Sequence, residues 1–275
     1  MVKTNLSEPS AGPRRLGRIR MSQTLAGIFV AGVLLYLFVP VAVTLLFSFT
    51  ISPRLSLPIE GVTLEWYGQA FSNPLFTDAL VNSLILAAIT SIVAGVIGTA
   101  FSFGLVQLRR RTRRVFLTVG LMPAVIPALV LGIALALWFR ELGLAQGFGN
   151  ACIGHILVGL PFVILTMNAR LETFDFTVLD AARDLGASPW RTFRDITFPL
   201  IRPTVLGAAL LAMALSLDEF VVTWFNIGNS QTLPVLIWGL LRRGIDPSIN
   251  ALASVVLLCL VGLVLLAHRL TRKIQ

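Results

Sequence analysis

The sequence predicts an all-α, polytopic membrane protein with six transmembrane helices. Of its 275 residues, 56% are hydrophobic and only 13% are charged, whereas a soluble domain normally carries about 25% charged residues. The mean hydropathy is +0.86. The apolar residues also gather into long runs, and a helix needs about 20 of them to cross a bilayer. A soluble protein is therefore excluded.

The apolar runs divide the chain into six predicted spans and two polar tails. The spans are residues 25–49, 80–106, 115–139, 151–167, 204–225 and 251–267. A transmembrane domain then covers residues 25–267, with an N-terminal tail over 1–24 and a C-terminal tail over 268–275. The first run is longer than the apolar region of about 7–15 residues in a secretory signal peptide, so we predict an uncleaved first span.

The basic residues predict how these spans are oriented. The chain has 22 Lys and Arg against 13 Asp and Glu, which gives a net charge of +9. If the N-terminus is cytoplasmic, 18 of the basic residues fall on the inner side and 4 on the outer side. The positive-inside rule therefore predicts that both termini are cytoplasmic. In a membrane protein such a surplus indicates topology and contact with anionic lipid, and not a nucleic-acid partner.

The loop between the fourth and fifth spans, residues 168–203, is predicted to begin with a short helix that ends in a tight corner. Thr177 can cap this helix, with Asp180 three residues later as in a capping box. Gly186 suits the left-handed backbone position that commonly follows the end of a helix. A corner is therefore expected at Gly186.

A second short helix is predicted directly after this corner. Ser188 suits its N-cap and Pro189 its first helical position, and we expect Pro199 to end it and Pro203 to open the fifth span. Three apolar side chains recur along it at three-residue spacing, namely Trp190, Phe193 and Ile196. Such a stripe suits the groove of a partner protein or a helix that rests on the membrane surface, and the residue pattern favours neither.

Seven positions of the loop match a known pattern in type and spacing. They are Asp180, Ala181, Ala182, Gly186, Ile196, Phe198 and Pro199. They resemble the EAA motif of the inner-membrane permease subunits of ABC importers, which reads Glu-Ala-Ala, three residues, Gly, nine residues and Ile-x-Leu-Pro. Two positions depart mildly, because Asp180 replaces Glu and Phe198 replaces Leu. We refer to residues 168–203 as the EAA-like loop.

The resemblance implies the fold of a type I ABC importer permease and a mechanical role for the loop. In such permeases the loop forms a coupling helix that docks on the ATP-binding subunit. The coupling residues that it implies here are Asp180, Ala181, Ala182, Gly186, Trp190, Phe193, Ile196 and Pro199. The implied partners are a dimer of ATP-binding subunits on the cytoplasmic face, a second permease subunit and an external solute-binding protein, at a bacterial inner membrane.

The chain itself is expected to catalyse no reaction. Its sequence has no G-x-x-x-x-G-K-[ST] pattern for binding ATP, so ATP and magnesium would be bound by the partner subunit. Its two histidines, His155 and His268, are far apart and no ligand cluster accompanies either, so no metal site is predicted. His155 is expected to make a polar contact inside the fourth span.

Two adjacent acids, Asp218 and Glu219, lie inside the fifth apolar run. An Asp in the middle of a span costs about 2.5–3.5 kcal/mol on insertion scales, which favours a function for the pair. One carboxylate would line a translocation pathway and favour a cationic solute. The alternative is an internal cap, or an ion pair with Arg140 or Arg243.

The C-terminal third of the chain contains four segments that point to one group within these permeases. Residues 216–220, 232–234, 243–247 and 250–253 resemble the spermidine/putrescine permeases of the PotC and PotI type. This resemblance implies an ATP-driven importer whose solute is a polyamine. The alternative is a secondary transporter that is driven by an ion gradient and uses Asp218 or Glu219 for proton coupling.

Overall fold

The computed structural model describes residues 13–52, 58–242 and 247–272, and these form helices joined by short connections. The helices are α1 (Pro13–Phe47), α2 (Glu65–Ser72), α3 (Pro74–Val106), α4 (Arg110–Val125), α5 (Ala128–Glu141), α6 (Phe148–Glu172), α7 (Thr177–Asp184), α8 (Pro189–Thr192), the π-helical turn η1 (Phe193–Thr197), α9 (Phe198–Asp218), α10 (Val221–Asn226), α11 (Leu233–Leu241) and α12 (Pro247–Arg272). Over these residues the fold is all-α, as predicted, and its one extended pairing is an isolated bridge between Thr50 and Val62.

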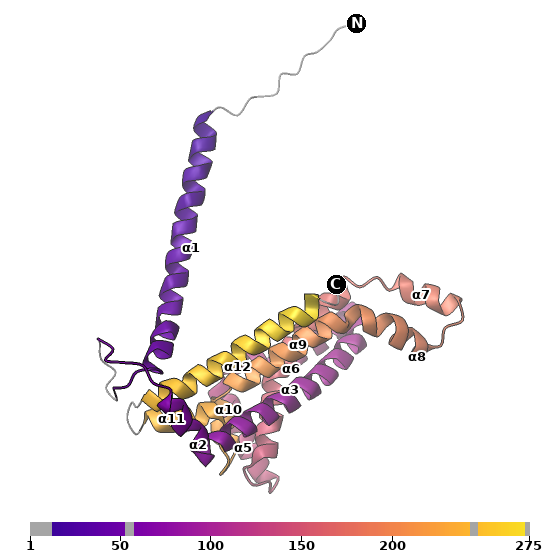
Figure 1. Cartoon of the computed structure of the whole chain (residues 1–275). Coiled ribbons are helices and arrows are strands. Elements are labelled where there is room, and N and C mark those ends of the chain that lie inside the picture. Colours follow the sequence, from indigo (N-terminus) through magenta and orange to yellow (C-terminus); the bar gives the residue numbers. More distant parts are fainter. Residues whose placement is uncertain (1–12, 53–57, 243–246, 273–275) are drawn as a thin grey trace.

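The centre of the bundle is the packing of α3, α6 and α9 (Figure 1). These helices approach closely because small residues face one another. A Cβ atom at Gly98 of α3 would lie 2.6 Å from Val163 of α6, and one at Gly159 of α6 would lie 3.2 Å from Ala212 of α9. Helices in lipid gain stability from such close contact, since no hydrophobic force drives them together.

The predicted spans correspond to these helices, with changes in their bounds. Four stretches are long and apolar enough to cross a membrane, namely Thr24–Phe47, Pro74–Val106, Phe148–Glu172 and Pro189–Asp218. The bent pair α4 and α5 gives up to one more, and the described apolar part of α12 is the shorter stretch Pro247–Gly262. The fourth span is longer at both ends than the predicted residues 151–167.

The third predicted span, residues 115–139, is wrong as a single helix. It is broken between α4 and α5, whose axes differ by 99°. Ile126 has extended backbone (φ −74°, ψ 127°) and Pro127 follows with ψ 133°. A residue before proline is pushed out of the helical region because the proline ring clashes with it. The sequence contains this signal at Pro127, but the apolar run conceals the break.

The fifth predicted span, residues 204–225, is also divided. Helix α9 ends at Asp218, Glu219 is extended (φ −72°, ψ 107°), and α10 begins at Val221. The two acids therefore do not lie on a continuous helix. They stand at a break inside an apolar run, where backbone groups lose their helical partners.

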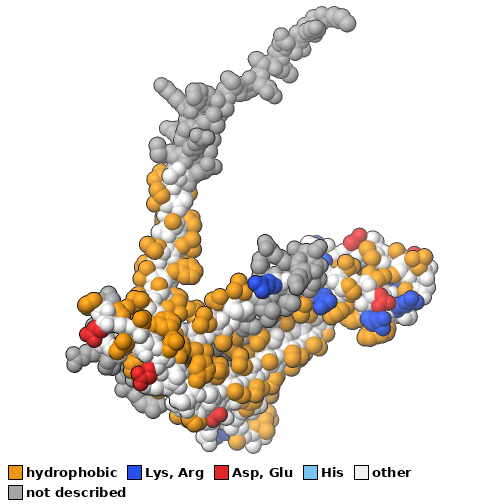
Figure 2. All heavy atoms as spheres, in the orientation of Figure 1, with side chains coloured by type: hydrophobic (Ala, Val, Ile, Leu, Met, Phe, Trp, Pro, Cys, Tyr) orange, Lys and Arg blue, Asp and Glu red, His pale blue; other side chains and the backbone are white. Residues whose placement is uncertain are grey.

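Helix α1 extends away from the bundle and contacts it through α12, and α7 and α8 project from the end of the bundle opposite α2 and α11 (Figure 1). None of the most apolar stretch of α1 is buried within the chain. Hydrophobic side chains cover α1 and the length of the bundle, whereas most charged side chains in view lie near its ends (Figure 2). A helix that is apolar on all sides must be covered by lipid or protein, which agrees with a membrane-spanning role.

Candidate functional site

The EAA-like loop begins with α7, whose first turn is capped by Asp175. The Asp175 carboxylate accepts hydrogen bonds from the Thr177 hydroxyl at 2.7 Å and from the Thr177 amide at 3.0 Å. These two bonds, the hydroxyl's first, hold the pKa of this exposed carboxyl below its ordinary value. The prediction that Thr177 is the cap was wrong, because Thr177 is the first helical residue and its hydroxyl points back to Asp175.

The corner at Gly186 is confirmed. Its backbone is left-handed, with φ +81°. The Gly186 amide donates to Arg183 O at 2.9 Å, and the Ala187 amide donates to Ala182 O at 3.0 Å. This pair of bonds is the Schellman pattern, which satisfies the last carbonyls of a helix. The chain therefore reverses here through a stable and defined corner.

Helix α8 and the start of η1 together present an exposed aromatic pair. Its N-cap is Ser188, as predicted, whose hydroxyl accepts from the Arg191 amide at 3.3 Å. Trp190 is 68% exposed and stacks on Phe193, with ring centroids 5.9 Å apart. Ile196 is only half-exposed, since it turns toward the bundle. The exposed part of the predicted stripe is therefore Trp190 with Phe193.

Pro199 does not end the second helix, and Pro203 does not open a new one. Helix α8 continues through η1 into α9 as one 30-residue helical stretch. The Phe198 amide donates to Phe193 O, five residues earlier. Proline lacks an amide hydrogen and its ring clashes with the carbonyl four residues back. The wider π turn accommodates Pro199, so the helix bulges instead of stopping.

The residues matched to Glu-Ala-Ala lie on α7, the first helix of this hairpin, and differ in their exposure. Asp180 is exposed and pairs with Arg183 at 3.2 Å, and Ala181 is exposed. Ala182 is buried. Beneath the hairpin, a cavity of about 320 Å³ separates it from the end of α3 and is lined by side chains that include Phe103 and Phe176. The start of the loop still packs on the bundle, because Phe176 and Leu179 contact its buried core.

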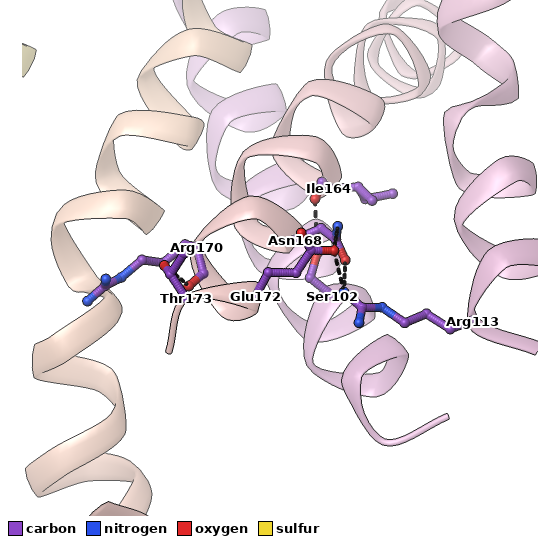
Figure 3. A network of polar contacts seen from close by, with 7 residues as sticks. All are labelled: Ser102, Arg113, Ile164, Asn168, Arg170, Glu172 and Thr173. Carbon is purple, nitrogen blue, oxygen red and sulfur yellow. Dashed lines mark hydrogen bonds and ion pairs between the residues drawn. The ribbon is translucent and has the colours of Figure 1, made fainter. Parts of the chain in front are cut away.

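A polar cluster joins the base of the EAA-like loop to α4 (Figure 3). Arg113 Nη2 donates to Asn168 Oδ1 at 2.8 Å and forms an ion pair with Glu172 Oε1 at 2.9 Å. Asn168 Nδ2 also donates to Glu172 Oε1 at 3.2 Å, and beside this cluster the Ser102 hydroxyl joins α3 to Ile164 O. Arg113 is one of the basic residues that predict the orientation of the spans, and no spacing rule connects it with Glu172.

The break between α9 and α10 separates the roles of the two acids. Glu219 Oε1 accepts the Val222 amide at 2.9 Å and so caps α10. Asp218 is exposed, and among the described residues no hydrogen bond or ion pair occupies its carboxylate. The internal cap is therefore correct for Glu219. No ion pair joins either acid to Arg140 within the described chain, and Arg243 lies outside it.

His155 lies beside this break, where the sequence analysis expected only a polar contact inside the fourth span. It is 1% exposed, and its two ring nitrogens lie 2.6 Å from the hydroxyls of Ser216 and Thr223. No group of three or more metal-ligating side chains occurs in the described part of the chain. The polar interior is thus built from neutral hydrogen bonds and a cap.

Sequence comparisons identify the family. Residues 91–275 match the model of the family described as binding-protein-dependent transport system inner membrane component. The chain is 32% identical over 253 residues to the spermidine/putrescine transport system permease protein PotC of Escherichia coli (strain K12), covering 92% of this chain and 96% of the relative. It is 32% identical over 230 residues to the putrescine transport system permease protein PotI of the same strain, covering 81% and 82%.

Solved structures with the same fold come from ABC importers. A bacterial ABC transporter involved in the import of the acidic polysaccharide alginate matches with a TM-score of 0.72 at 14% identity, over 95% of this chain and 99% of its own. The methionine transporter MetNI, described in inward-facing conformations, matches with a TM-score of 0.59 at 17% identity, over 74% and 99%. The fold is therefore that of a type I ABC importer permease.

Family and fold together fix the kind of protein. It is a multi-pass inner-membrane permease subunit and not an enzyme, with ATP hydrolysis in a separate subunit. Its partners are of the kinds that such importers use, a binding protein and an ATPase. These findings do not support the alternative of an ion-gradient-driven transporter. The chain belongs to the family of binding-protein-dependent transport system inner membrane components.

Proposed function

We propose that this chain is one of two permease subunits in an importer for a polyamine, with Asp218 as the carboxylate that meets the cationic solute. The observation that carries the proposal is the difference between two adjacent acids. Glu219 is engaged as a cap, whereas Asp218 is exposed beside a helix break. The relative PotC is named for spermidine/putrescine transport, and the relative PotI for putrescine transport. Both names support a solute of the same class.

The helix break also favours a cation at Asp218. The last carbonyls of α9 lose their helical amide partners because Glu219 is extended, and the C-terminal end of a helix carries partial negative charge. Broken helices inside membrane proteins use such ends to coordinate cations. The carboxylate of Asp218 adds a full negative charge to the same place.

The EAA-like loop would carry the mechanical signal. Its hairpin projects from the bundle (Figure 1) and exposes Trp190 and Phe193, which suits a groove on a cytoplasmic ATP-binding subunit. ATP and magnesium would be bound by that subunit. In this arrangement both termini are cytoplasmic, a second permease chain completes the pathway, and an external solute-binding protein delivers the polyamine.

The test compares Asp218→Asn with Glu219→Gln in the assembled transporter. Asp218→Asn removes the charge that meets the solute, and we expect polyamine uptake to fall about tenfold or more, since one charge-assisted contact is worth about 1.5–3 kcal/mol. Glu219→Gln keeps an oxygen that can accept the Val222 amide, so uptake should fall by less than about threefold. Uptake of radiolabelled spermidine and putrescine into cells or vesicles measures both.

Two controls make this test decisive. The amount of each variant in the membrane, measured by an epitope tag, separates poor insertion from poor transport. Uptake should also stop in cells that are depleted of ATP but retain a proton gradient. Equal uptake by wild type and Asp218→Asn would overturn the assignment of Asp218.

A further inference from the structure

One buried histidine joins both halves of the broken fifth span to helix α6. His155 Nδ1 lies 2.6 Å from the Ser216 hydroxyl, near the end of α9, and His155 Nε2 lies 2.6 Å from the Thr223 hydroxyl in α10. Ser216 comes before the break at Glu219 and Thr223 comes after it. A single rigid ring therefore sets the separation between the two half-helices.

The hydrogen bonds around the ring define its tautomer. The Thr223 hydroxyl donates its one hydrogen to Glu219 O at 2.8 Å, because a carbonyl oxygen can only accept. Thr223 Oγ1 must then accept from His155, so Nε2 carries the hydrogen. In a neutral ring Nδ1 then has the free lone pair, and the Ser216 hydroxyl lies 2.6 Å from it. The same hydroxyl is a donor to Thr90 Oγ1 of α3 at 3.4 Å, which extends the chain of contacts to a third helix.

This chain of hydrogen bonds ends on the backbone of the break itself. Glu219 is the extended residue between α9 and α10. Its carbonyl oxygen therefore lies outside the hydrogen-bonding pattern of α9. In the bilayer interior an unpaired carbonyl costs several kcal/mol, and Thr223 supplies the partner. The conformation of Glu219, and with it the direction of the adjacent Asp218 side chain, therefore depends on groups that His155 holds in place.

We propose that His155 is the positioning residue of the break, acting through Ser216 and Thr223 to orient the Asp218 carboxylate. The ring also belongs to α6, which continues to Glu172 at the base of the EAA-like loop, about 25 Å away at 1.5 Å per residue. A displacement of α6 by the loop thus reaches both half-helices. The proposal rests on the proposed function, since it takes Asp218 as the group that meets the solute.

The direct test measures the environment of position 218 without any solute. In a chain with Cys152→Ser and Cys259→Ser, Asp218→Cys supplies a single thiol. The rate at which a reagent labels this thiol is measured in three chains, which carry His155, His155→Gln or His155→Phe. Gln offers one donor and one acceptor, whereas Phe fills the volume and offers neither. We expect His155→Phe to change the rate by about fivefold or more and His155→Gln to restore most of it, because the bonds at risk are worth about 1 kcal/mol each.

A second measurement follows uptake in chains that retain Asp218. His155→Phe should reduce polyamine uptake per assembled complex by about tenfold, and His155→Gln by less than about threefold. Thr166→Val is the matched control, since this α6 hydroxyl donates within its own helix, to Phe162 O, and its loss should change neither readout. If His155→Phe does not assemble, Thr223→Val removes the contact to Glu219 O with little change in volume.

The outcomes separate the two proposals. Unchanged labelling in both His155→Phe and Thr223→Val would overturn the positioning role. Labelling that changes in His155→Phe and is restored in His155→Gln supports the positioning role. If the wild-type transporter then takes up no polyamine, the proposed solute is wrong while the role of His155 stands.

Discussion

At the scale of single residues, backbone conformation decides what position 186 tolerates. Gly186 has φ +81°, yet no atom lies within 4 Å of where a Cβ would stand. A side chain therefore meets no obstacle, and its cost comes only from the left-handed backbone, about 1 kcal/mol for alanine. Asparagine enters this region more readily than alanine.

We therefore expect Gly186→Ala to weaken coupling more than Gly186→Asn does. Alanine should shift the corner between α7 and α8 and lower solute-stimulated ATP hydrolysis by the assembled transporter several-fold, whereas asparagine should retain most of it. Hydrolysis by reconstituted complexes with and without binding protein measures the effect. Equal loss in both variants would point to steric exclusion by a partner at this surface.

A second prediction concerns the ion pair at the base of the EAA-like loop. Arg113 is 25% exposed and Glu172 57% exposed, and such pairs contribute little when isolated. Because Arg113 also bonds the buried Asn168, we expect Arg113→Ala to lower the free energy of unfolding by about 1 kcal/mol. Thermal unfolding of the purified complex in detergent measures this change.

The neighbouring arginine provides the control for that prediction. Arg114 is exposed, and its side chain makes no ion pair within the described chain, so Arg114→Ala should leave the unfolding temperature unchanged. The exchange of Arg113→Glu with Glu172→Arg should recover part of the loss. A double variant no better than Arg113→Glu alone would show that the pair itself does not stabilise this junction.

At the scale of elements, the two broken spans support each other. The Asn226 side chain of α10 donates to Gly132 O of α5 at 3.0 Å, and the Gly147 amide donates to Asn226 O at 2.9 Å. A Cβ at Gly132 would lie 3.3 Å from the Val222 backbone, so glycine allows the contact. These contacts pack one half of the third span, α5, directly against one half of the fifth span, α10.

The π turn η1 sets the direction in which Trp190 of α8 points. It inserts one residue relative to an α-helix, and one residue turns a helix by about 100°. Pro199→Ala removes the ring clash that favours the bulge, so we expect the turn to relax toward α-helix and rotate Trp190 away. Stability should be unchanged or higher, whereas solute-stimulated ATP hydrolysis should fall several-fold. Pro203→Ala, one turn beyond the bulge, is the control that should spare coupling.

At the scale of the whole molecule, the predicted orientation can be tested with exposed positions at opposite ends. Leu185, at the tip of the EAA-like loop, is 88% exposed, and Val62, between α1 and α2, is 77% exposed. In a chain with Cys152→Ser and Cys259→Ser, a membrane-impermeant thiol reagent should label Leu185→Cys only from the cytoplasmic side and Val62→Cys only from the outside. The reverse pattern would overturn the orientation inferred from the basic residues.

The sequence by itself determined the features that depend on local rules. Long apolar runs made the chain an all-α membrane protein, a glycine with the right spacing placed the corner at Gly186, and Ser188 with Pro189 began α8. Each of these follows from hydropathy or backbone preference within a few residues. Thr177 misled because a threonine serves either as an N-cap or within the first helical turn, and Pro199 misled because a π turn can accommodate a proline inside a helix.

Only the tertiary structure decided which polar groups meet. The ion pair of Arg113 with Glu172 spans 59 residues, and the contacts of His155 with Ser216 and Thr223 span 61 and 68. No local pattern predicts such pairs. The breaks at Ile126 and Glu219 were likewise hidden in apolar runs, because hydropathy records whether a segment prefers lipid but not whether its backbone remains helical. The different surroundings of Asp218 and Glu219 follow from one of these breaks, where the side chains of Glu219 and Thr223 satisfy backbone groups that the break exposes.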